Sequence, residues 1–130
     1  MIGLDTTALI DISKSNKEIL DLINNLDEDI CSTIINHQEV MFGLDLDDST
    51  YAEEEGFFDD FFNGIFVFHL EIPSSKEASK IKWQLRKNGM VIDEMDCSIA
   101  GILLINGVNK IITRNVKHFE NISGLEVIPY

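Results

Sequence analysis

The stretch MIGLDTTALID, residues 1–11, places a short apolar run directly before one acid and two threonines. The run Ile2–Leu4 has the length and composition of a buried strand, because it contains no polar side chain. Asp5, Thr6 and Thr7 are residue types that commonly cap a helix, and residues 8–12 suit the helix itself. The segment therefore predicts a strand that turns directly into a helix, with polar side chains at the junction.

The rest of the chain repeats this alternation of short apolar strands and amphipathic helices. Strands are predicted at 30–33, 65–70, 109–113 and 125–128, and helices at 15–26, 34–44, 49–62, 73–87, 93–106 and 115–119. Such alternation is typical of a parallel sheet covered by helices on both faces. We therefore predict an α/β fold, a three-layer α/β/α arrangement around a central parallel sheet of about five strands. The length suits a single domain over residues 1–130.

Composition and length place the chain among folded globular proteins. Of its 130 residues, 45% are hydrophobic and 25% are charged, which is the balance of a chain that buries a core. The longest uninterrupted apolar stretch, 99–105, has seven residues, whereas a helix that crosses a bilayer needs roughly 20. The amino terminus lacks the basic segment and cleavage site of a secretory signal. We therefore expect no membrane partner, a cytoplasmic location, and reduced cysteines at Cys31 and Cys97.

The net charge of −13 is distributed unevenly along the chain. The first 75 residues hold 17 acids and only two lysines. A chain this negative has little non-specific affinity for nucleic acid, which depends on Lys and Arg displacing counterions from phosphates. Five of the ten bases lie within residues 76–87, where helical spacing places Lys82 and Arg86 in one stripe and the other three in another. Two interpretations remain open for this segment, a phosphate-binding track and a solvated helix face.

Polar side chains follow two of the predicted strands at the points where those strands end. Asp5 and Thr6 come after the first strand, and Thr113 and Asn115 come after the fourth. Ligands of such sheets bind beyond the carboxyl ends of the strands, where the topology reverses. These residues are therefore candidates for a functional site.

Two acids on predicted helices, Glu39 and Asp96, are expected at the same edge of the sheet. Structural alternatives exist, since Asp5 and Asp93 suit helix caps and Glu39 suits a solvated helix position. Carboxylates about 4 Å apart repel each other by roughly 4 kcal/mol at an effective dielectric constant near 20, so a cluster of them needs a cation. Oxygen ligands without histidine or thiol favour Mg²⁺ or Mn²⁺. The pattern therefore predicts metal-assisted hydrolysis of a phosphodiester bond.

Four blocks of sequence carry a resemblance to a known family. They are MIGLDTTALID at 1–11, TIINHQEVMFG at 33–43, DCSIAG at 96–101 and IITRNVKHFENISGLEVI at 111–128. In this order and spacing, they resemble the PIN domains of VapC toxins over essentially the whole chain. The resemblance implies an Mg²⁺- or Mn²⁺-dependent endoribonuclease that is the toxin of a type II toxin–antitoxin pair. It further implies a homodimer, an RNA substrate, and a cognate antitoxin that blocks the site.

The same resemblance assigns roles to individual residues. The acidic metal ligands are Asp5, Glu39 and Asp96, Asn115 occupies the fourth acidic position, and the supporting residues are Thr6, Thr113 and Asp93. An amide oxygen at position 115 can bind a cation or a hydrogen-bond donor, but it supplies no charge. Arg114 and Lys117 flank Asn115 and are predicted to contact RNA phosphates.

Two questions remain open on the sequence alone. Asn115 and the net charge of −13 also suit a catalytically weakened PIN-like module with an RNA-binding or regulatory role. A metal-independent nuclease would use Arg114 and His118 instead, and chelation separates it from the metal enzyme. The helix at 49–62 carries four phenylalanines on one face, which suits either a groove for an amphipathic partner segment or plain packing on the sheet.

Overall fold

The computed structural model describes all of residues 1–130, and its core is a five-stranded sheet. The strands are β1 (Ile2–Leu4), β2 (Ile30–Thr33), β3 (Phe66–Phe68), β4 (Lys110–Ile112) and β5 (Glu126–Ile128). The helices are α1 (Thr6–Ser13), α2 (Lys17–Asn24), α3 (Ile34–Phe42), α4 (Tyr51–Asn63), α5 (Ile72–Lys87), α6 (Glu94–Ile105) and α7 (Val116–Phe119). All neighbouring strands pair in parallel, in the order β3-β2-β1-β4-β5. The predicted α/β class is confirmed.

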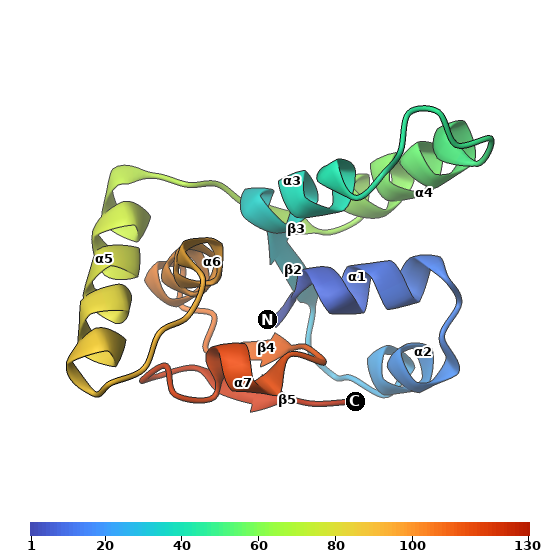
Figure 1. Cartoon of the computed structure of the whole chain (residues 1–130). Coiled ribbons are helices and arrows are strands. Elements are labelled where there is room, and N and C mark those ends of the chain that lie inside the picture. The colour runs from blue at the N-terminus through green and yellow to red at the C-terminus, as the bar shows by residue number, and fades with distance from the viewer.

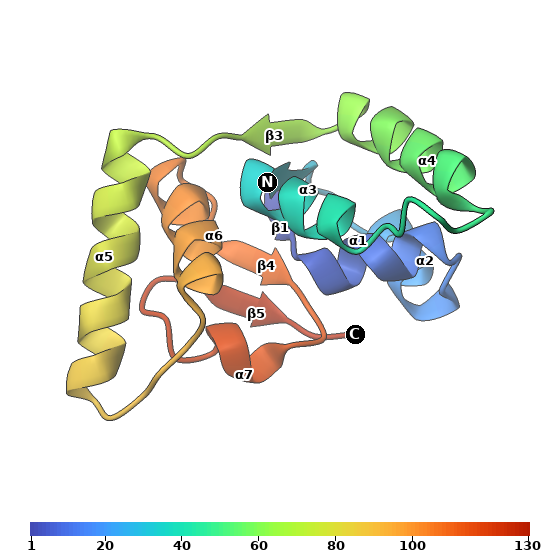
Figure 2. The ribbon, with the colours of Figure 1, turned by 45° about the horizontal axis from the view of Figure 1, so that its top comes forward.

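Helices cover both faces of the sheet, which gives the predicted three layers. Figure 1 shows α5 and α6 on one side of the strands and α1 and α2 on the other, and Figure 2 shows the same separation from a second direction. One core cluster joins the sheet to α5, α6 and α7 through residues such as Ile81, Ile102 and Phe119. A second cluster joins it to α1, α2 and α4. The helix α3 directly follows β2 and contributes to both clusters. It therefore lies at the carboxyl end of that strand, in contact with both helical layers.

The order of the strands locates a crevice at the carboxyl edge of the sheet. From β1 the chain proceeds outward to β2 and β3, and it then crosses back to place β4 on the opposite side of β1. The helix α1 follows β1 and the helix α7 follows β4, and they pack in different core clusters. They therefore leave the sheet on opposite sides of the place where these two strands end. In open α/β sheets, ligands bind at such a reversal, beyond the carboxyl ends of the strands.

Some element boundaries differ from the sequence-based prediction, and each difference has a local cause. The third strand spans three residues rather than 65–70 because β3 lies at the sheet edge, where Phe66 and Leu70 are exposed. The second helix begins at Lys17, because the side chain of Asn16 caps it by accepting hydrogen bonds from the backbone of Glu18 and Ile19. Ser15, with a φ of 56°, occupies the left-handed region and separates α1 from α2.

The helices α5 and α6 approach each other very closely. A Cβ atom placed on Gly101 of α6 would lie 2.8 Å from both the backbone nitrogen of Ala78 and the backbone oxygen of Ser74 in α5. Only glycine fits this contact, which fixes the position of α6 and, with it, the Asp96 side chain at the start of that helix. None of the seven helices combines the length and apolar character needed to cross a bilayer.

Candidate metal centre

Asp5 lies at the junction between β1 and α1, where its carboxylate is buried and held from two sides. Its Oδ1 atom accepts a hydrogen bond from Asn36 Nδ2 at 3.2 Å, and its Oδ2 atom accepts one from Thr113 Oγ1 at 2.7 Å. Asp5 occupies the cap position of α1, but its side chain makes no capping hydrogen bond. The carboxylate is therefore directed at the crevice between the strands and does not serve the helix.

Glu39 projects from α3 toward the same crevice. Thr6 Oγ1 donates a hydrogen bond of 2.7 Å to Glu39 Oε1, and it accepts one of 3.0 Å from Asn36 Nδ2. Burial raises the pKa of the Glu39 carboxyl, the Thr6 hydrogen bond opposes this, and the negative charge of Asp5 adds to the rise. Glu39 is therefore partly desolvated and faces other acids, unlike a solvated helix residue.

Asp96 lies in the first turn of α6 and is also buried. Its Oδ2 atom is 2.8 Å from His118 Nδ1 of α7. Burial raises the pKa of Asp96 to about 6, against the lowering effect of the His118 hydrogen bond, and the charges of Asp5 and Glu39 raise it further. The charge of Asp5 thus acts on both Glu39 and Asp96, as expected for acids that share one site.

One cavity of about 510 Å³ collects these side chains. Among the residues that line it are all four predicted for the metal site and three of their neighbours: Asp5, Glu39, Asp96, Asn115, Thr6, Asp93 and His118. Asp93 also caps α6, because its Oδ1 atom accepts a hydrogen bond of 2.7 Å from the backbone of Met95. Thr113 is fully buried and does not line the cavity, but its hydroxyl donates to Asp5 and accepts from the backbone of Asn115 at 2.9 Å.

The two bases predicted to contact RNA lie beside this cavity and do not line it. Arg114 forms an ion pair with Asp11, with Nε 2.8 Å from Oδ2, and the hydroxyl of Tyr130 donates a hydrogen bond to the same oxygen, also at 2.8 Å. Lys117 lines an adjoining cavity together with His118. Arg114 is therefore held in place by a buried acid of α1, while both cations remain near the acidic site.

Two residues of the site were not among the sequence-based candidates for the metal centre. Asn36 bridges Asp5 and Thr6, and its own position is fixed because Thr33 Oγ1 donates to its Oδ1 atom at 2.7 Å. The residue type gives no indication of this role, because Asn36 is a neutral amide on an apolar helix. Its place three residues after Thr33, which caps α3, is the pattern that points to it. His118 was considered only for a metal-independent nuclease, whereas its hydrogen bond to Asp96 makes it a neighbour of the carboxylates.

The chemistry of the cavity fits a hydrated divalent cation. Its lining holds four carboxylates and no lysine or arginine, so the acids lack a counter-charge. No three side chains of the His, Cys, Asp and Glu types stand close enough to ligate a single ion at once. Mg²⁺ satisfies this arrangement, because it commonly takes one or two carboxylates directly and keeps several waters that other acids can hold.

Comparison with known proteins gives the same architecture. The sequence profile of the family described as PIN domain matches residues 2–125. VapBC2 from Rickettsia felis, solved bound to a DNA fragment from its promoter, superposes with a TM-score of 0.87 and 18% identity over 100% of this chain and 99% of that chain. VapBC-1 from nontypeable Haemophilus influenzae gives a TM-score of 0.82 and 23% identity over 99% of this chain and 98% of that chain.

A more distant structural match is VapC20 from Mycobacterium tuberculosis, which is described as a sarcin–ricin loop cleaving toxin. It superposes with a TM-score of 0.64 and 11% identity over 85% of this chain and 87% of that chain. No curated protein sequence gives a significant match. At these identities the structural matches establish the fold, whereas the profile match covers nearly the whole chain and establishes the family. The chain belongs to the PIN domain family.

Proposed function

We propose that the protein is an Mg²⁺- or Mn²⁺-dependent endoribonuclease and the toxin of a type II toxin–antitoxin pair. The observation that carries this proposal is the convergence of Asp5, Glu39 and Asp96 in one cavity without a lysine or arginine. The family membership supports a nuclease, and VapC20, a sarcin–ricin loop cleaving toxin, shares the fold. We further propose that the protein acts on RNA in the cytoplasm.

The three acids are the proposed metal-site residues, with Asn115 at the fourth position; one or two of the acids bind the ion directly and the others hold its waters. A divalent ion held there lowers the pKa of a bound water and stabilises the charge that develops on the leaving oxygen. Asn115 is exposed and neutral, so it contributes a hydrogen-bonding amide in place of a fourth negative charge. The missing charge counts against a second bound ion more than against the first.

Neighbouring side chains fix the orientation of each proposed ligand. Thr113 and Asn36 hold Asp5, Thr6 holds Glu39, and His118 holds Asp96. Hydrogen bonds of this kind orient metal ligands, and their loss typically lowers metal affinity or activity by about 10- to 100-fold.

Arg114 and Lys117 are the proposed phosphate contacts. The Nε atom of Arg114 is bound to Asp11, which leaves the other guanidinium N–H groups free to donate to a phosphate. Both cations flank Asn115 in sequence and lie next to the acidic cavity. They would attract RNA to a surface that is otherwise strongly negative.

A cognate antitoxin and a second copy of the chain are the proposed protein partners. Structural matches such as those from Rickettsia felis and Haemophilus influenzae are VapBC complexes, which supports the antitoxin. In α4, Phe58 is buried in the core while Phe57 retains 36% exposure. The helix α4 thus packs on the core through Phe58, and Phe57 leaves an apolar edge for an amphipathic antitoxin segment to cover.

The direct test is cleavage of a structured RNA by the purified chain with Mg²⁺, with Mn²⁺ and with EDTA. We expect cleavage with either ion and none with EDTA, and we expect Asp96→Asn to lose cleavage while its thermal unfolding stays cooperative. Cleavage that persists in EDTA would support the metal-independent nuclease instead. RNA binding without cleavage under all conditions would support the regulatory module.

A further inference from the structure

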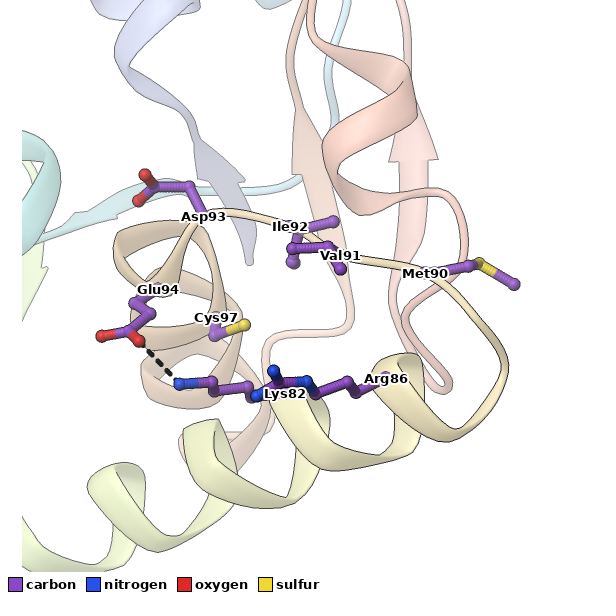
Figure 3. Close-up of a pocket in the computed structure, with 8 residues that line it drawn as sticks. All are labelled: Lys82, Arg86, Met90, Val91, Ile92, Asp93, Glu94 and Cys97. Atoms are coloured by element: carbon purple, nitrogen blue, oxygen red, sulfur yellow. Dashed lines mark hydrogen bonds and ion pairs between the residues drawn. The ribbon is translucent and has the colours of Figure 1, made fainter.

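A second cavity, of about 330 Å³, lies between α5, the start of α6 and the segment that joins them. Figure 3 shows Val91 and Ile92 on one side of it and the long side chains of Lys82 and Arg86 on the other. The thiol of Cys97 forms part of its wall and is almost fully buried. The cavity therefore combines an apolar wall with two cationic side chains, and two acids, Asp93 and Glu94, also line it. Its volume falls in the lower part of the range of small-ligand pockets, about 300–1,000 Å³.

The cations of this cavity are only partly neutralised. Lys82 Nζ lies 2.6 Å from Glu94 Oε1, and the Glu94 side chain is 77% exposed. Arg86 forms no ion pair, and its guanidinium lies 5.4 Å from the centre of the Trp83 ring. In Figure 3 the Asp93 carboxylate points away from the cavity. Arg86 is therefore the one base of this cavity without an acidic partner, and its guanidinium is free to meet an anion.

This cationic cavity adjoins the acidic cavity. Asp93 lines both of them, so only the first turn of α6 separates the two. A strand of RNA that ran from one cavity to the other would therefore cross only the first turn of α6. An acidic peptide would satisfy the cations, but it would leave the wall of Met90, Val91 and Ile92 without an apolar or planar group to cover it.

We propose that the cationic cavity binds one nucleotide of the RNA, adjacent to the phosphate that is cleaved. Arg86 and Lys82 contact its phosphate, and the face of its base packs on Val91 and Ile92. A guanidinium is well suited to phosphate, since it donates two parallel hydrogen bonds. This inference rests on the proposed function, because it assigns a part of the same substrate. The two stripes of bases predicted on this helix then differ in role, since Lys82 and Arg86 face a cavity while Lys80 is an exposed residue outside it.

The first experiment measures nucleotide binding without any cleavage. The 130-residue chain, labelled with ¹³C at its methionine methyl groups, is titrated in EDTA with AMP, GMP, CMP and UMP, while the NMR signal of Met90 is followed. We expect at least one nucleotide to shift the Met90 signal in a saturable manner. Arg86→Gln should weaken that binding by about tenfold, whereas Lys80→Gln, which removes the same charge from the same helix, should leave it unchanged.

Three results of this titration would overturn the assignment. They are a Met90 signal that no nucleotide moves, an equal effect of Arg86→Gln and Lys80→Gln, and an aspartate-rich peptide that binds at this cavity more tightly than every nucleotide. Arg86 is exposed, so its replacement should fold, and the thermal unfolding of each variant is recorded as a check. A second variant, Val91→Asp, places a carboxylate on the apolar wall and should also weaken nucleotide binding.

The second experiment separates this inference from the proposed function. With an RNA substrate, Arg86→Gln should raise KM about tenfold with little change in kcat, as expected for a contact made equally in the ground state and the transition state. Lys80→Gln should change neither. A wild-type chain that binds nucleotides but cleaves no RNA would overturn the proposed function and leave the binding site standing. A chain that cleaves RNA with the same KM in both variants would overturn the subsite alone.

Discussion

The hydroxyl of Thr113 donates a hydrogen bond of 2.7 Å to the carboxylate of Asp5, across a separation of 108 residues in the sequence. Thr113 follows β4 and Asp5 follows β1, and these two strands are neighbours in the sheet. The contact therefore exists because the chain crosses back to place β4 beside β1. The fold itself builds this part of the acidic cavity.

Thr113→Val is expected to lower metal affinity and RNA cleavage by about 10- to 100-fold, because valine keeps the shape of threonine but cannot donate to Asp5. The free energy of unfolding should fall by about 1–3 kcal/mol, because the backbone of Asn115 also loses its hydrogen bond to the Thr113 hydroxyl. Cleavage kinetics and urea denaturation measure the two effects. Thr50→Val, which alters an exposed threonine before α4, is the matched control. Equal activity of the two variants would show that Thr113 does not orient a functional carboxylate.

The stability of the metal-free protein should depend on pH through Asp96. Its pKa is raised from 3.8 to about 6, mainly by burial, so the folded chain holds this proton more tightly than the unfolded chain does. The stabilisation is present below about pH 4 and is lost as the pH rises through about 6. Asp96→Asn abolishes this ionisation. The free energy of unfolding of Asp96→Asn minus that of the wild type should therefore rise between pH 4 and pH 7, by at most about 3 kcal/mol.

Urea denaturation in EDTA at the two pH values measures this change. Comparing the variant with the wild type cancels the carboxyl groups whose pKa is lowered, such as Glu28 and Glu94, since they are present in both proteins. A difference in stability that is the same at pH 4 and pH 7 would contradict the burial of an ionisable Asp96.

Divalent cations should stabilise the folded chain, because the three acids come together only in that state. An ion at ten times its Kd adds about 1.4 kcal/mol, which corresponds to a rise in Tm of about 3–6 °C for a chain of this size. We expect Mn²⁺ and Mg²⁺ to raise the Tm of the wild type but not that of Asp5→Asn. Potassium chloride at matched ionic strength controls for screening, and an equal rise with it would argue against a specific ion.

Gly101→Ala is expected to destabilise the protein by about 1–3 kcal/mol, since the new methyl group would lie 2.8 Å from backbone atoms of α5, a degree of overpacking that forces the helices apart. Gly56→Ala is the matched control, because no atom lies within 4 Å of its added Cβ. Alanine in the middle of α4 should stabilise the protein by about 0.5–1 kcal/mol. Thermal or chemical denaturation measures both changes, and a neutral Gly101→Ala would contradict the close contact of α5 and α6.

The sequence predicts the fold well because hydrophobic patterning is strong in this chain. Each of the five strands was predicted within a few residues, since each is a short apolar run between polar segments. The ends of elements were less predictable. The start of α2 depends on the side chain of Asn16, and the shortness of β3 follows from its place at the sheet edge, which the local sequence does not encode.

The acidic residues of the site were also predictable, whereas their neighbours were not. Asp5 ends an apolar strand, and Glu39 and Asp96 lie on apolar helices, so each acid stands out in its own segment. The roles of Asn36 and His118 depend on partners 31 and 22 residues away. The pairing of Arg114 with Asp11 likewise depends on where α1 lies beside β4. Such contacts follow only from the three-dimensional arrangement.

In the proposed metal centre, Asp5, Glu39 and Asp96 hold a divalent ion in one cavity. Crystals of the wild-type chain grown with Mn²⁺ test it most directly, when diffraction is recorded on both sides of the manganese absorption edge. We expect an anomalous peak within coordination distance, about 2.0–2.3 Å, of at least one of these carboxylates, and no such peak in crystals of Asp5→Asn. A chain that cleaves RNA in the same buffer but shows no manganese at these acids would contradict it.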